Sequence, residues 1–152
     1  MAIGARSSVQ TAKLLPMQRR EVRGGRNPVA SYTEGPNSPL SLATQFGNLL
    51  FLSGMGPIDP ATKTVPTQDI RQQVRITLNN LKQALEGSGS ALGNVLKVNC
   101  YLRNADDFQA YNEVYAEFFP DGFPARTTVL AAPPRKDVNV AIEAVAYIVS
   151  PE

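Results

Sequence analysis

The chain has 152 residues, of which 43% are hydrophobic and 18% charged, and its formal net charge is +2. These values are typical of one soluble globular domain with its own core, and no apolar run reaches the ~18 residues of a membrane span. The sequence has no histidine and a single cysteine, Cys100. Histidine-dependent catalysis and disulfide cross-links are therefore excluded, and no carboxylate cluster has the spacing of a metal site.

The first thirty residues differ from the rest, because they carry six basic residues against one acidic residue. We interpret residues 1–30 as a basic, flexible arm and residues 31–152 as a single domain. The first 18 or so residues of the arm are basic and acid-free, and they weakly resemble an organellar transit peptide. We expect a cytoplasmic protein, with a mitochondrial location as the alternative if the arm is a transit peptide. Nucleic-acid binding is not expected, because the remainder of the chain is acidic and has no basic stripe.

Two local patterns come first along the domain. Residues 38–46 alternate in polarity, and Gly47-Asn48 is a two-residue turn into residues 49–54, which predicts a β-hairpin that ends at Gly54. Apolar residues then recur at helical spacing from 69 to 86, with Asp69 or Thr67 as the cap.

A strand and a second helix follow. The strand covers residues 95–102, with Leu96, Val98, Cys100 and Leu102 expected on one face. The helix covers about residues 106–118, and its aromatic stripe is interpreted as core. The stripe comprises Phe108, Tyr111, Val114, Tyr115 and Phe118.

The last two strands are expected to form a second hairpin. Residues 123–130 and 138–149 have the two-residue period of strands, and the break at 133–137 is rich in proline and charge. Such a hairpin would place Arg126 opposite or diagonal to Glu143. Two interpretations remain open: a cross-strand ion pair, or an arginine fork that takes a ligand carboxylate through two hydrogen bonds.

The expected order of elements is β-β-α-β-α-β-β. This order predicts an α+β domain in which both helices cover one face of a mixed sheet. The other face also needs a cover, and other copies of the chain in a closed ring would provide it.

From about residue 38 to residue 148 the chain resembles the Rid family of reactive-intermediate imine and enamine deaminases, also known as the YjgF/YER057c/UK114 family. The matching segments are Gly47-Asn48-Leu49-Leu50-Phe51-Leu52-Ser53-Gly54, Asn80-Leu81-Lys82, Asp107-Phe108, Asn112-Glu113-Val114-Tyr115-Ala116-Glu117-Phe118-Phe119, Pro124-Ala125-Arg126 and Ile142-Glu143-Ala144-Val145-Ala146. The resemblance implies a chorismate-mutase-like fold, a homotrimer with ligand sites between subunits, and hydrolysis of 2-aminoacrylate and related imines to keto acid and ammonia without a cofactor or metal.

The resemblance also assigns site residues. Arg126 stands at the arginine that binds the substrate carboxylate, and Glu143 matches the second glutamate of the family pattern Ile/Val-Glu-Ile-Glu-Ala. We therefore expect catalytic roles for Arg126 and Glu143. The expected substrate-binding residues are Arg126, Thr127, Thr128, Gly54 and Leu40.

Four positions depart from the family pattern. Leu40 replaces a tyrosine, Met55 a glutamine and Thr128 a cysteine, while Ala141 replaces the first glutamate, which positions the attacking water. Leu40, Met55 and Ala141 would make the pocket roomier and more apolar than the usual site of the family. Such a pocket would suit a bulkier, aminomuconate-like substrate as well as 2-aminoacrylate. The favoured function is a deaminase of enamines and imines. The alternatives are a non-catalytic ligand-binding trimer and, less favoured, an endoribonuclease or translation inhibitor.

Overall fold

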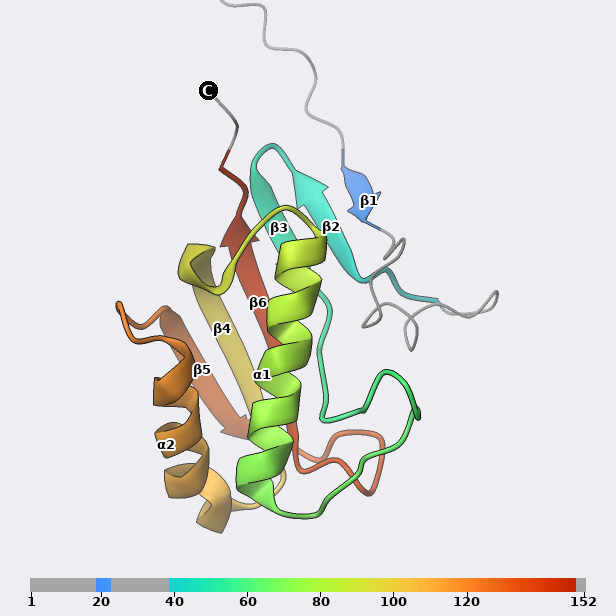
Figure 1. Cartoon of the computed structure of the whole chain (residues 1–152), viewed down its shortest axis with the longest axis vertical. Coiled ribbons are helices and arrows are strands. Elements are labelled where there is room, and N and C mark those ends of the chain that lie inside the picture. Colours follow the sequence, from blue (N-terminus) through green and yellow to red (C-terminus); the bar gives the residue numbers. More distant parts are fainter. Residues whose placement is uncertain (1–18, 23–38, 150–152) are drawn as a thin grey trace, which may run out of the picture.

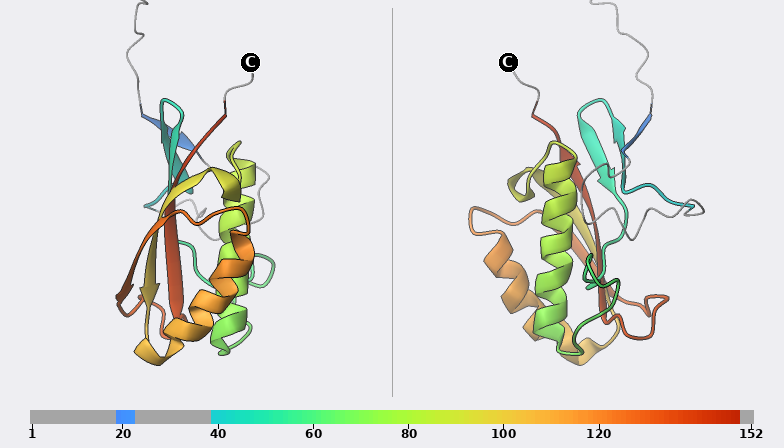
Figure 2. Two further views of the ribbon diagram at one scale, coloured as in Figure 1. Left: turned by 90° about the vertical axis from the view of Figure 1, so that its left-hand side faces the viewer. Right: turned by 45° about the vertical axis from the view of Figure 1, so that its right-hand side comes forward.

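The computed structural model describes residues 19–22 and 39–149. Its strands form one mixed, six-stranded sheet in the order β1-β2-β3-β6-β4-β5, and both helices lie on the same side of that sheet (Figures 1 and 2). The strands are β1 (Arg20–Val22), β2 (Ala43–Phe46), β3 (Leu49–Leu52), β4 (Val95–Leu102), β5 (Ala125–Leu130) and β6 (Val140–Tyr147), and the helices are α1 (Ile70–Gly87) and α2 (Phe108–Phe118). The predicted α+β class is confirmed.

The N-terminal arm falls mostly outside the described residues. Within it, β1 runs antiparallel to β2 and forms one edge of the sheet. The other edge is β5.

The predicted first hairpin is confirmed. β2 and β3 pair antiparallel from Ala43↔Leu52 to Phe46↔Leu49. Gly47 has φ 59° in the turn between them, a conformation that favours glycine because it has no Cβ. The side chains of Ala43, Leu50 and Leu52 are buried in the core between the sheet and α1.

Helix α1 has the start that the sequence predicted. The Asp69 side chain accepts a hydrogen bond from the backbone N–H of Gln72, and so caps the first turn. The apolar side chains at helical spacing are fully buried against the sheet: Val74, Leu78, Leu81, Ala84 and Leu85. None of the helices in the described ranges is long and apolar enough to cross a membrane.

Two details of the predicted core are wrong. Leu96 is 47% exposed, because an irregularity in the β4–β6 register between Val95 and Lys97 shifts the alternation of β4. Phe108 is 45% exposed, because it opens α2 beyond the edge of the packed stripe. Tyr111, Val114 and Tyr115 are buried as predicted.

The predicted second hairpin is also wrong. β5 runs parallel to β4, and β6 lies between β3 and β4 and runs antiparallel to both. The connection from β4 through α2 to β5 is a helical crossover, which joins parallel strands. The loop from β5 to β6 then passes over the end of β4, so β5 and β6 are separated by a whole strand (Figure 1).

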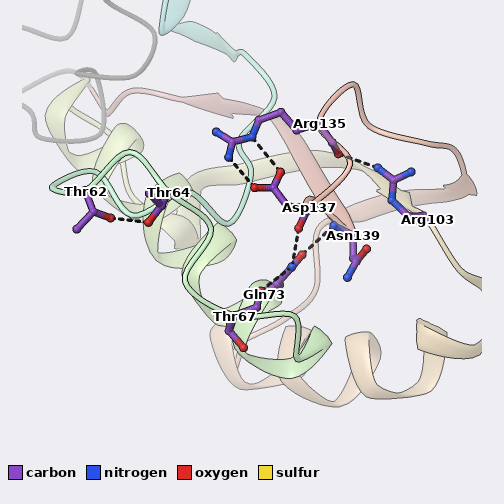
Figure 3. Close-up of polar contacts among 8 residues, drawn as sticks. All are labelled: Thr62, Thr64, Thr67, Gln73, Arg103, Arg135, Asp137 and Asn139. Atoms are coloured by element: carbon purple, nitrogen blue, oxygen red, sulfur yellow. Dashed lines mark hydrogen bonds and ion pairs between the residues drawn. The ribbon is translucent and has the colours of Figure 1, made fainter.

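That loop is tied down by two buried or half-buried side chains (Figure 3). Arg103, just after β4, donates to the carbonyls of Pro133, Arg135 and Val138 at 2.8–3.0 Å. Gln73 of α1 donates to the carbonyls of Thr67 and Asp137, and accepts from the N–H of Asn139. Together these contacts fix the loop between the end of the sheet and the start of α1.

Candidate functional site

Arg126 lies on the helix-covered side of β5. Its cross-strand partner is Val98, which is fully buried under the helices, and opposed residues on paired strands point to the same side. One guanidinium nitrogen, Nη2, donates to Asn112 Oδ1 at 2.7 Å. The guanidinium carbon is 4.6 Å from the centre of the Tyr115 ring and 5.1 Å from that of Tyr111. Helix α2 thus holds the guanidinium by a hydrogen bond and two cation–π contacts.

This guanidinium opens into a cleft of about 340 Å³ at the sheet edge. The lining residues are Asn112, Tyr115, Ala116, Phe123, Pro124 and Arg126. Within the described part of the chain, Arg126 has no carboxylate partner. A guanidinium offers five N–H donors in a planar fork, so most of its donors remain for a bidentate acceptor such as a carboxylate.

The floor behind Arg126 is chemically inert. The Tyr111 hydroxyl donates to Cys100 Sγ, and burial raises the pKa values of Cys100, Tyr111 and Tyr115. These groups therefore stay protonated and serve packing. The Thr128 hydroxyl oxygen is buried beside them rather than in the cleft.

Glu143 lies on the opposite, uncovered side of the sheet. Its cross-strand partner is Asn99, which donates from Nδ2 to Glu143 Oε1 at 2.9 Å, and the Tyr101 hydroxyl donates to the same oxygen at 3.0 Å. Thr127 shares this side, where its hydroxyl accepts a hydrogen bond from Lys97 Nζ at 2.7 Å. We call this uncovered side of the sheet the open face.

A hollow of about 570 Å³ lies on the open face beside Glu143. Strands β1 to β3 and their flanks surround it. Its lining includes Gly54 and the polar residues Arg19, Glu21, Ser41, Ser53 and Glu143. A Cβ on Gly54 would meet nothing within 4 Å, so the single chain gives no steric reason for glycine there. A second, smaller hollow of about 190 Å³ extends from Glu143 toward Lys97 and Phe51.

The predicted neighbourhood of Arg126 and Glu143 is wrong. The two residues lie on opposite faces of the sheet, because β4 separates their strands and the register gives their side chains opposite directions. The cross-strand ion pair therefore does not form within one chain, whereas the arginine fork for a ligand carboxylate stays a prediction. Gly54 and Thr127 accompany Glu143 on the open face, and Leu40 is 48% exposed just before β2.

Other expectations about the site also change. Met55 is fully buried and its backbone pairs with that of Ile142, so it belongs to the core and not to a pocket. The supporting residues Asn112, Asn99 and Tyr101 were not predicted. Asn112 lies in one of the segments that match the family, but no role was assigned to it. The contacts of Asn99 and Tyr101 with Glu143 could be found only once β4 was known to pair with β6. Among the described residues, no group of three His, Cys, Asp or Glu side chains could hold a metal ion.

Comparison with known proteins identifies the fold and the family. Residues 33–148 match the family model described as Endoribonuclease L-PSP. A RutC family protein of Pyrococcus horikoshii is 46% identical over 112 residues, which are 74% of this chain and 89% of that protein. The 2-iminobutanoate/2-iminopropanoate deaminase of Dermatophagoides farinae is 40% identical over 113 residues, 74% of this chain and 88% of its own.

A solved structure agrees with these matches. The crystal structure of Escherichia coli TdcF with bound serine superposes with a TM-score of 0.70 at 32% identity, and the match covers 76% of this chain and 92% of TdcF. Structural neighbours of this kind have the chorismate-mutase-like fold that the sequence implied. The chain therefore belongs to the Endoribonuclease L-PSP family, the group also called YjgF or Rid.

Proposed function

We propose that this protein is a cofactor-independent deaminase that hydrolyses 2-imino acids and their enamine tautomers to 2-keto acids and ammonia. The observation that carries the proposal is the guanidinium of Arg126. It is held by Asn112 and two tyrosine rings, faces an open cleft, and has no carboxylate partner in the described ranges. Its geometry suits the carboxylate that all these substrates share. The name of the Dermatophagoides relative supports the same reaction.

The site is completed by a second copy of the chain. Arg126 and Glu143 point away from each other, so one chain cannot bring both to one small substrate. The open face also exposes Phe46, Phe51 and Val129 by 43–44% around its polar centre, as an interface does. In a homotrimer, Arg126 at the sheet edge of one chain would face the open face of the neighbouring chain, with its larger hollow and its Glu143.

The reaction in such a cleft needs three things: a clamped carboxylate, an aimed water and a proton carrier. Arg126 clamps the carboxylate. Water adds its oxygen to the carbon of the protonated imine while a water proton passes to Glu143, which gives a neutral carbinolamine. Glu143 then protonates the amino nitrogen, and the C–N bond breaks with its electron pair on nitrogen as the C=O bond forms. Glu143 accepts the hydroxyl proton and passes it to the released ammonia, which leaves as ammonium. Glu143 thereby returns to its starting carboxylate form.

The size of the substrate stays open between two classes. Position 40 carries an exposed leucine and position 141 an alanine, so bulky side chains meet little obstruction on the open face. Both 2-aminoacrylate and a bulkier, aminomuconate-like imine are therefore candidates. Comparing them in one assay decides between them.

The test measures ammonia release from imines generated in situ by an amino-acid oxidase. We expect Arg126→Ala to abolish turnover, and the matched Arg126→Lys variant, which keeps the charge but loses the fork, to retain a small part of it. Glu143→Gln is expected to be inactive while it still binds keto acids.

Refolding mixtures test the shared site directly. When Arg126→Ala and Glu143→Gln chains are refolded together in equal amounts, about one interface in four pairs an intact Arg126 with an intact Glu143 of the neighbour. Recovered turnover in the mixture supports the intersubunit site. No recovery, with both variants still trimeric, contradicts it.

The alternative function is a ligand-binding trimer without turnover, and Ala141 favours it because the family's first glutamate is missing there. That protein would bind keto acids in an Arg126-dependent way and release no ammonia from any imine. RNA incubated with the wild-type protein tests the nuclease that the family description names.

A further inference from the structure

Two donors converge on one oxygen of Glu143. Asn99 lies directly opposite Glu143 on the neighbouring strand and reaches Oε1 at 2.9 Å, and Tyr101 reaches the same atom diagonally at 3.0 Å. A diagonal contact of this kind is within reach of an aromatic side chain on a sheet. The second oxygen, Oε2, has no hydrogen-bond partner within the described part of the chain.

Ala141 makes this arrangement possible. It is the cross-strand partner of Tyr101 and lies two residues before Glu143 on the same face. Because its side chain is a single methyl group, the Tyr101 ring can lie across that position toward Glu143. The carboxylate is thereby fixed at one oxygen and presented at the other.

We propose that Tyr101 and Asn99 are positioning residues for Glu143. They hold its Oε1, so that Oε2 faces the larger hollow of about 570 Å³ and takes the proton of the attacking water. This inference rests on the proposed deaminase function and adds the residues that orient its base. Two donors on one oxygen also restrict rotation of the carboxyl group. Oε2, the proton acceptor, therefore keeps one orientation relative to the two hollows beside Glu143.

The state of Tyr101 agrees with this role. Its hydrogen bond to Glu143 raises the pKa of Tyr101, with burial as the next cause. The hydroxyl therefore remains a donor across the pH range in which imines are hydrolysed. The amide of Asn99 does not titrate at all, so both contacts persist together.

The experiment removes each donor without removing its bulk. Tyr101→Phe deletes one hydroxyl, and Asn99→Leu replaces the amide by an apolar group of similar size. Tyr147→Phe is the matched control, because Tyr147 is a half-buried tyrosine on the same face of β6. Each variant is measured as a purified trimer for turnover of 2-aminoacrylate and for binding of the keto-acid product.

We expect Tyr101→Phe and Asn99→Leu each to lower kcat roughly 10- to 100-fold, the worth of a hydrogen bond to a charged group, with keto-acid Kd changed by less than about twofold. Tyr147→Phe should change neither value. A Glu143→Gln background has no turnover to lose, and there Tyr101→Phe should leave the keto-acid Kd and the melting temperature unchanged, because it acts through that carboxylate. A purely structural role would lower stability or binding in both backgrounds.

Two results overturn the inference and separate it from the function. If the wild type turns over and depends on Arg126, but Tyr101→Phe keeps its kcat, or weakens keto-acid binding as much in the wild type as in the Glu143→Gln background, the positioning role is wrong and the deaminase stands. If the wild type releases no ammonia from any imine, the deaminase itself is wrong, and the positioning role falls with it.

Discussion

The two faces of the sheet differ most clearly along β6. On the helix-covered face, Val140, Ile142, Ala144 and Ala146 are at most 2% exposed. On the open face, Ala141, Glu143, Val145 and Tyr147 are all half-buried in the single chain. One strand thus has one side whose packing is complete and one side whose packing is not.

The polar groups on the two sides follow the same division. Gln73 and Asn80, under the helices, are buried and bound to backbone groups of their own chain. On the open face, Glu143, Asn99 and Tyr101 bind one another in a setting that solvent still reaches. The covered face therefore carries the core of the domain, with Arg126 at its edge, and we expect the open face to carry the contact between copies of the chain and the base of the proposed reaction.

The largest effect is expected from a charge on the open face. Phe51→Asp should abolish the proposed trimer and with it the proposed turnover, because an unpaired carboxylate in an apolar interface costs several kcal/mol. Phe108→Asp is the matched control, since Phe108 is 45% exposed against 44% for Phe51 but lies on α2. Sedimentation velocity and ammonia release measure both variants. A trimeric, active Phe51→Asp protein would contradict the assignment of the open face.

On the covered side, Gln73→Leu should lower stability without changing assembly. The substitution leaves the carbonyls of Thr67 and Asp137 and the N–H of Asn139 without their partner, a loss of about 3 kcal/mol. Gln72→Leu, one position earlier and exposed, should change the free energy of unfolding by less than about 0.5 kcal/mol. Urea denaturation at a fixed protein concentration compares them, and equal midpoints would contradict the prediction.

A smaller effect is expected at the carboxylate clamp. Asn112→Ala removes the side-chain acceptor that Arg126 has within the described ranges but leaves the two tyrosine rings, so keto-acid affinity should fall about tenfold. Asn79→Ala, on the exposed side of α1, should leave it unchanged. Calorimetric titration gives both values. Unchanged affinity in Asn112→Ala would mean that ring stacking alone orients the guanidinium.

The smallest change is a shift in one titration. The ordinary pKa of tyrosine is 10.0, and the hydrogen bond to Glu143 raises the pKa of Tyr101, so its phenolate should form at higher pH than in a free tyrosine. Glu143→Gln removes the charge and should lower that pKa toward the ordinary value. The difference in phenolate absorbance between each protein and its Tyr101→Phe derivative isolates this residue. The contact stabilises the fold below pH 10 and is lost as pH rises through the raised pKa.

Local patterns in the sequence were sufficient for the local elements. The turn at Gly47, the cap at Asp69 and the helical spacing of α1 each depend on residues a few positions apart, and all three were predicted. The same holds for the buried aromatic residues of α2. These features follow from dihedral preferences and periodicity, which the sequence displays directly.

Strand order could not be predicted in this way. The period of two assigns residues to two faces but does not say which strands are neighbours, so Arg126 and Glu143 were placed together when the insertion of β4 separates them. A single irregularity beside Leu96 likewise reversed the direction of one side chain. The supporting residues Asn99 and Tyr101 became visible only when β4 and β6 were paired in register.

The central place of β6 has a consequence for how the protein is made. This strand is the last in the described chain, yet it fills the gap between β3 and β4, whose residues are synthesised long before it. Until residues 140–147 leave the ribosome, β3 and β4 each lack the partner strand on one edge, and the sheet is incomplete. Folding of the sheet therefore waits until residues 140–147 have been synthesised, and nascent chains that stall earlier become substrates for chaperones and proteases.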